Sequence, residues 1–140
     1  MKIARPVCLL ILVSIVSGCL DQTTLSKITA DTREKLLKTS IGMSKQEVID
    51  IVGAEPQEVA GLQTPDGQNL AVLNNPYRSE LIQSDDKTLE VDFFVTGDLD
   101  NNNVISNEEL TPLVFDDGKM IGWGWSYLVS EDHNFKITVK

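Results

Sequence analysis

The order of hydrophobic and polar residues predicts two short helices early in the folded part of the chain. The first is expected at residues 33–38, before a turn at Gly42. The second follows Ser44 and Glu47, which form an S-x-x-E capping box, and apolar residues then recur on one helical face. A glycine commonly ends a helix, so we expect this one to stop at Gly53.

Strand patterns dominate the second half of the chain. Apolar and mostly polar residues alternate over residues 89–96, which predicts a strand with one buried face. Further strands are expected at residues 78–82, 113–115 and 119–127. The last two flank Asp116-Asp117-Gly118, a hairpin signal. Helices followed by antiparallel strands indicate an α+β domain with helices on one face of the sheet.

The N-terminus has the pattern of a secretory signal. Lys2 and Arg5 precede an apolar run at residues 7–16, which is too short to span a bilayer. The sequence Val16-Ser17-Gly18-Cys19 resembles the bacterial lipobox, in which the cysteine thiol receives a diacylglyceryl group and becomes the new N-terminus. The alternative is an ordinary cleaved signal peptide that leaves a free thiol at Cys19.

Cysteine content agrees with lipidation. Cys8 lies in the apolar run and leaves with it, so Cys19 is the one cysteine of the mature chain and no internal disulfide can form. Two or three acyl chains hold a protein durably on a membrane. We therefore expect a lipoprotein signal peptide at residues 1–18, a lipidated tether at 19–30 and a single α+β domain at 31–140.

The net charge of the mature chain bears on its class of partner, and the residue after Cys19 bears on which membrane holds it. Removing residues 1–18 takes away Lys2 and Arg5, so the formal net charge changes from −9 to −11. This charge disfavours nucleic acid, which needs a basic patch. In enterobacterial lipoprotein sorting, Asp directly after the lipidated cysteine retains the protein in the inner membrane. Leu20 stands at that place, which favours the periplasmic face of the outer membrane over the inner membrane.

Residues 41–48, Ile-Gly-Met-Ser-Lys-Gln-Glu-Val, with Gly53 and Pro56, resemble the SmpA/OmlA group of small lipoproteins. This group includes the BamE subunit of the outer-membrane β-barrel assembly machine. Other segments look more like a set of uncharacterised proteobacterial lipoproteins that share this helical start, namely residues 75–80, 110–115 and 118–124. The resemblance implies two N-terminal helices packed on a three-stranded antiparallel sheet, an envelope location, and a role in outer-membrane assembly or maintenance.

Residues 98–109 fit the twelve-residue calcium loop of EF-hands at nearly every place. Asn103 stands where the sharp turn usually has glycine, and asparagine is the next most tolerant of left-handed backbone. The alternative is a solvated acidic turn capped by Ser106 or Asn107. The expected ligands are side chains and one carbonyl, from Asp98, Asp100, Asn102, Val104 (carbonyl), Ser106 and Glu109.

An aromatic stripe ends the last predicted strand. Ile121, Trp123, Trp125 and Tyr127 alternate with small residues and would share one face. Such a stripe usually fills a core. Trp and Tyr are also enriched among interface hot spots, so Trp123, Trp125 and Tyr127 are the candidate partner surface.

We do not expect an enzyme. The single histidine, His133, lies among polar residues near the C-terminus, with no second imidazole to complete a zinc site and no evident nucleophile. The leading hypothesis is a non-enzymatic interaction or scaffold module, anchored through acyl chains on Cys19 and binding another envelope protein. The alternative is a calcium-binding lipoprotein that uses residues 98–109, with calcium as its one cofactor.

Overall fold

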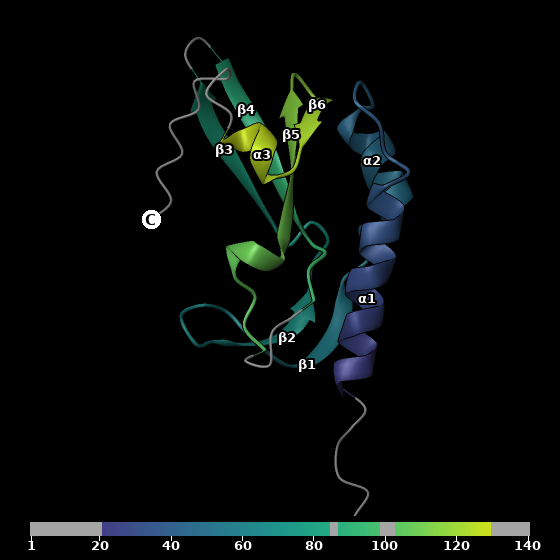
Figure 1. Ribbon diagram of the computed structural model, residues 1–140, viewed down its shortest axis with the longest axis vertical. Helices are drawn as coiled ribbons and strands as arrows, with labels where there is room; N and C mark the ends of the chain where they lie inside the picture. The colour runs from purple at the N-terminus through teal and green to yellow at the C-terminus, as the bar shows by residue number, and fades with distance from the viewer. Residues whose placement is uncertain (1–20, 85–86, 99–102, 130–140) are drawn as a thin grey trace, which may run out of the picture.

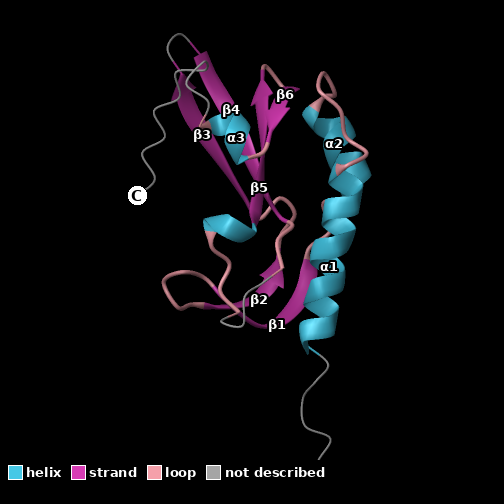
Figure 2. Cartoon of the chain, in the orientation of Figure 1, coloured by secondary structure: helices cyan, strands magenta, loops and turns pink. Residues whose placement is uncertain are grey.

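The computed structural model describes residues 21–84, 87–98 and 103–129 (Figure 1). Cys19, the expected signal peptide and His133 therefore lie outside the described residues. Two helices come first along the described chain, and six strands, a 3-10 helix and a last short helix follow (Figure 2). In order, the elements are α1 (Asp21–Leu36), α2 (Lys45–Val52), β1 (Gln57–Gln63), β2 (Asn69–Leu73), β3 (Arg78–Ser84), β4 (Lys87–Val95), the 3-10 helix η1 (Asn107–Glu109), β5 (Leu110–Asp116), β6 (Lys119–Trp123) and α3 (Trp125–Leu128).

The strands form two antiparallel sheets. β1 pairs with β2, and the larger sheet has the order β3-β4-β5-β6. Helix α1 contacts both β1 and β4, and Figure 1 shows it running beside the two sheets. Its N-terminal end lies near the β1–β2 hairpin, and its C-terminal end lies near α2. None of the described helices combines the length and hydrophobicity needed to cross a bilayer.

The three-stranded sheet implied by the family resemblance is wrong. The fold is a mostly-strand α+β fold with a helix pair, a four-stranded sheet and a separate two-stranded sheet. Within each of β1 and β2, one residue is buried, Leu62 and Leu73 respectively. The two-residue burial period that reveals a strand is therefore missing from this hairpin.

The segment expected as a tether, residues 19–30, is helical from Asp21 onward, because α1 begins there. The short helix expected at residues 33–38 is the end of this longer helix. The buried residues of α1 recur at the helical period and form one stripe, but two of them are polar. The sequence therefore does not show a continuous apolar helical face. The stripe consists of Leu25, Thr29, Thr32 and Leu36.

Helix α2 confirms the capping box. The Ser44 side chain accepts a hydrogen bond from the Glu47 backbone, while the Glu47 carboxylate accepts one from the Ser44 N–H at 2.7 Å. Gly53 ends the helix at φ +89°, in the left-handed region that disfavours residues with a Cβ. The capping box fixes the entry of α2, and its buried Val48 and Val52 face the sheet.

β4 is buried on both faces, rather than on one as its alternation predicted. Phe93 belongs to a cluster with α3 and the β1–β2 hairpin. Its neighbour Phe94 belongs to a second cluster with α1 and α2. The β5–β6 hairpin is confirmed, with Asp117 at φ +47° and Gly118 at φ +72° in its turn. The larger sheet is therefore the centre of the molecule, with apolar contacts on each side.

Candidate functional site

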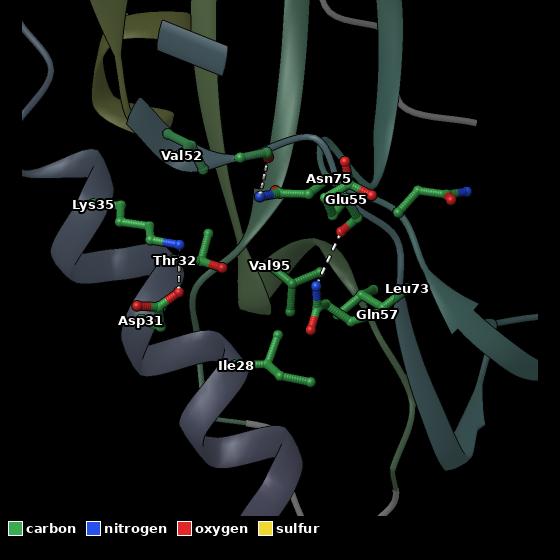
Figure 3. A pocket seen from close by; sticks show the side chains of 12 residues that line it. Ile28, Asp31, Thr32, Lys35, Val52, Glu55, Gln57, Leu73, Asn75 and Val95 are labelled. Carbon is green, nitrogen blue, oxygen red and sulfur yellow. Dashed lines mark hydrogen bonds and ion pairs between the residues drawn. The ribbon is translucent and has the colours of Figure 1, made fainter. Parts of the chain in front are cut away.

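A pocket of about 300 Å³ lies between α1, the end of α2, the β1–β2 hairpin and the end of β4 (Figure 3). Four of its residues lie on one face of α1, because they are spaced three or four positions apart. The lining consists of Ile28, Asp31, Thr32, Lys35, Val52, Gly53, Glu55, Gln57, Leu73, Asn74, Asn75 and Val95.

The inner wall of the pocket is apolar. Val52, Leu73 and Val95 are each at most 4% exposed and come from α2, β2 and β4. Ile28 of α1 is half-buried and extends toward the same space (Figure 3). Thr32, 7% exposed, adds a hydroxyl beside these groups. The pocket can therefore hold an apolar group that meets one polar contact on its α1 side.

The rim of the pocket is polar and ordered by local contacts. Asp31 and Lys35 form an ion pair at 2.8 Å on α1. The Asn75 side-chain amide donates to the carbonyl of Gly53 at 2.9 Å, and the Gln57 amide donates to the carbonyl of Glu55 at 3.1 Å (Figure 3). Amide side chains can donate and accept, so this rim can bind a ligand that has both kinds of group.

The structure describes eight of the twelve residues of the predicted calcium loop. Asp98 and residues 103–109 are described, whereas Asp100 and Asn102 lie outside the described residues. Asn103 adopts φ +55°, the left-handed conformation expected at the glycine place of the motif. Ile105 is 1% exposed and donates its N–H to the carbonyl of Gln63, and Val104 forms a parallel bridge with Gln63. The β1 strand thus supports the middle of the loop.

The two ends of the loop have other partners in this structure. The Glu109 carboxylate, on a residue 6% exposed, accepts hydrogen bonds from the N–H and hydroxyl of Ser106 at 2.7 and 2.6 Å. Asp98 is exposed and lies 3.7 Å from the guanidinium of Arg33. Among residues 21–84, 87–98 and 103–129, no three histidine, cysteine, aspartate or glutamate side chains gather as a metal site.

The aromatic stripe is divided by the end of β6. β6 ends at Trp123, so the prediction of one strand through residue 127 is wrong. Gly124, at φ +83°, changes the direction of the chain, and α3 begins at the next residue. Trp125 donates its indole N–H to the Leu110 carbonyl at 2.7 Å and packs on Phe93. Tyr127 packs against the same core cluster, whereas Trp123 is 44% exposed. A partner role for these aromatic residues stays a prediction.

Sequence reasoning did not identify the pocket or a buried charged cluster beside α2. The cluster joins Lys45 to Glu90 and Asp92 of β4, with Ser79 of β3. The position of Asp92 between the apolar residues Val91 and Phe93 could have revealed it, because a buried carboxylate needs a partner. The pocket had no comparable signal, since its walls come from segments far apart in the chain.

Comparison with known proteins gives one family match. Residues 66–129 match a family model described as a protein of unknown function (DUF3192). No curated protein and no solved structure matches the chain. The matched region begins before β2 and ends after α3, so it includes the four-stranded sheet and the predicted calcium loop. Its description states no function, and the resemblance to the SmpA/OmlA group stays a prediction.

Proposed function

We propose that this protein is a lipid-anchored envelope lipoprotein that acts as a non-enzymatic interaction module at the periplasmic face of the outer membrane. The observation that carries the proposal is the position of α1, which begins at Asp21. In the sequence, Asp21 stands two positions after Cys19, the expected lipidation site. The acyl chains would then attach almost directly to a helix that packs along the domain.

This arrangement would set the height of the pocket above the membrane. A helix rises 1.5 Å per residue, so Ile28 and Lys35 lie roughly 10 and 21 Å along α1 from Asp21. A binding surface at this distance suits a partner that is itself at the membrane. The apolar inner wall and the amide side chains of the rim suit the binding of such a partner.

Metabolic labelling with radioactive palmitate tests the lipid anchor. Cys19→Ala should lose the label and leave the membrane fraction, because acylation is the proposed membrane attachment. Cys8→Ala is the matched control, since this cysteine would be removed with the signal peptide, and it should label as the unaltered chain does. Equal labelling of Cys19→Ala and the unaltered chain would contradict the proposal.

The membrane that holds the protein is tested separately. Leu20→Asp places an acidic residue directly after the lipidated cysteine and should move the protein from outer-membrane to inner-membrane fractions in a sucrose gradient. Leu20→Asn, a polar substitution without the charge, is the control. An unaltered chain that already fractionates with the inner membrane would overturn the outer-membrane assignment while leaving lipidation intact.

Calcium binding is the second candidate function, and the left-handed Asn103 is the observation that favours it. Asp98, Asp100, Asn102, Ser106, Glu109 and the Val104 carbonyl would hold the ion, which would neutralise the carboxylates and stiffen the loop. Calorimetric titration into the millimolar range should show saturable heat that Glu109→Gln removes. Glu108→Gln, an exposed neighbour, is the matched control. Absence of saturable heat in the unaltered chain would exclude this function.

A further inference from the structure

We propose that the pocket binds an extended polypeptide segment of a partner, inserting one bulky aliphatic side chain that is flanked by a basic residue. The inference rests on the proposed function, because it states the chemistry of the partner that the interaction module recognises. It comes from three features of the pocket: its size, the charge of its rim and the type of hydrogen-bonding groups around its opening.

The size of the pocket favours a single large side chain. Its volume of about 300 Å³ is at the small end of ligand pockets. A dry cavity of about 150 Å³ can hold a benzene molecule. A leucine-sized side chain with its adjoining backbone would therefore fill the space against Val52, Leu73 and Val95. Residues that contribute most to binding at interfaces cluster in such well-packed, desolvated pockets.

The charge around the opening favours a cation beside the anchor. Asp31 and Glu55 contribute two carboxylates and Lys35 one ammonium, which pairs with Asp31, so the lining has a net charge of −1 from Glu55. The C-terminal end of α2 at Val52 adds the negative end of a helix dipole. A lysine or arginine next to the anchor would meet complementary charge, whereas an acidic neighbour would be repelled.

The hydrogen-bonding groups of the rim favour a peptide over a lipid chain. Gln57, Asn74 and Asn75 place amide side chains on the β1–β2 side of the opening. Each amide can donate to a peptide carbonyl and accept from a peptide N–H. An acyl chain has neither group at this position and would cover these polar groups without compensating hydrogen bonds, which is unfavourable.

The test uses the full chain, labelled with ¹⁵N and purified in detergent, and follows backbone amide shifts by NMR. Three capped pentapeptides are titrated: Gly-Lys-Leu-Lys-Gly, the same peptide with a central alanine, and Gly-Glu-Leu-Glu-Gly. We expect saturable shifts at Ile28, Thr32 and Leu73 with the first peptide. The other two should bind about tenfold more weakly. Equal binding of all three, or shifts located away from the pocket, would overturn the proposal.

Reversing the charge of one lining residue, Glu55, tests the proposal independently of the peptide series. Glu55→Lys should weaken binding of the lysine peptide and strengthen that of the glutamate peptide, because Glu55 is exposed at the opening and its change need not disturb the core. Glu58→Lys is the matched control, because it has the same charge change three residues away and lies outside the lining. In β1 its side chain points to the opposite face from that of its neighbour Gln57, which lines the pocket. An identical effect of both variants would show a nonspecific charge effect and overturn the proposal.

The last experiment tests whether the pocket binds a segment of another protein or the C-terminal segment of this chain. Residues 130–140 contain Asn134-Phe135-Lys136, a bulky side chain beside a basic residue. The lysine peptide should bind the full chain and a chain ending at Val129 equally. Binding to the shortened chain alone would identify the C-terminal segment as the occupant and overturn the proposal of an external partner. Palmitate labelling is unaffected by any of these results, so failure of this inference and failure of the lipid anchor are distinguishable.

Discussion

The ammonium of Lys45 lies 2.9 Å from both carboxylate oxygens of Asp92, a side chain that is entirely buried. The Lys45 ammonium donates a hydrogen bond to Asp92 Oδ1, whereas its contact with Oδ2 is an ion pair without a hydrogen bond. Glu90 Oε1 accepts from the same ammonium at 2.7 Å, and Ser79 Oγ donates to Asp92 Oδ1 at 2.5 Å. Because Lys45 is the first residue of α2, this cluster fixes the start of the helix to the middle of β4.

We predict that Lys45→Met lowers the free energy of unfolding by about 2–3 kcal/mol, because it leaves the buried Asp92 carboxylate without its cation. This is at or below the lower limit of about 3 kcal/mol for breaking a fully buried pair, since the Lys45 side chain is 26% exposed. Lys38→Met is the matched control. Its ion pair with Glu34 is exposed, so its loss should stay below about 0.5 kcal/mol in urea unfolding. Equal losses in the two variants would show that the buried cluster adds no more to stability than an exposed ion pair.

The contribution of Lys45 should disappear at alkaline pH. Burial alone lowers the pKa of Lys45, but hydrogen bonds to Glu90 and Asp92 and the charge of both carboxylates outweigh it, so the pKa is raised above its ordinary 10.5. A raised pKa in the folded state means that the stabilisation is complete below pH 10.5 and is lost as pH rises through the folded-state pKa.

This dependence is measured as the difference in unfolding free energy between the unaltered chain and Lys45→Met at pH 7, 9 and 11–12. Burial also raises the pKa of Tyr77 and Tyr127, which weakens both proteins in the same alkaline range. Comparison of the two proteins cancels that effect. The difference should be constant from pH 7 to 9 and shrink above pH 10.5; a difference that persists unchanged at pH 12 would contradict the assignment.

Local signals explain which parts of the fold were predictable. The capping box of Ser44 and Glu47 acts within four residues, and the Asp117-Gly118 turn acts within two, so the sequence alone identified α2 and the β5–β6 hairpin. Helix α1 was missed because Thr29 and Thr32 occupy its buried stripe. Their positions are buried by packing against distant segments, which no local hydrophobic period records.

The two candidate sites also differ in how far the sequence alone could predict them. The calcium loop is a continuous motif, so its Asn103 conformation could be expected from spacing, although its end residues are engaged by Ser106 and Arg33. The pocket joins segments as far apart as Ile28 and Val95. Its formation depends on how α1 crosses the two sheets, and that crossing follows from tertiary packing rather than from any single stretch of sequence.

Gly122 and Tyr127 make a close contact that should not tolerate a side chain. A Cβ at Gly122 would lie 2.4 Å from three ring atoms of Tyr127. Gly122→Ala should therefore lower the free energy of unfolding by about 1–3 kcal/mol by overpacking. Tyr127→Ala removes the obstructing ring, so adding Gly122→Ala to it should have a much smaller effect. Additive losses in the double variant would show that the ring is not the cause.

Arg33 of α1 has two partners after the end of β4, and we expect them to contribute unequally. Its Nε donates to the Thr96 carbonyl at 2.9 Å, and its Nη2 donates to the same oxygen. Thr96 is 7% exposed, and the hydrogen bonds from the Arg33 guanidinium offset the free-energy cost of removing its carbonyl from water. Arg33→Met keeps much of the apolar stem but removes this donor, and it should lower the free energy of unfolding by about 1.5 kcal/mol.

The other partner of Arg33 is Asp98, at 3.7 Å, in a pair whose side chains are 51% and 84% exposed. Water and salt screen such a pair, so Asp98→Asn should change the free energy of unfolding by less than about 0.5 kcal/mol. Both variants are compared by urea unfolding in calcium-free buffer, because Asp98 also belongs to the predicted calcium loop. A larger loss for Asp98→Asn than for Arg33→Met would mean that the ion pair, rather than the hydrogen bond to Thr96, holds α1 against the end of β4.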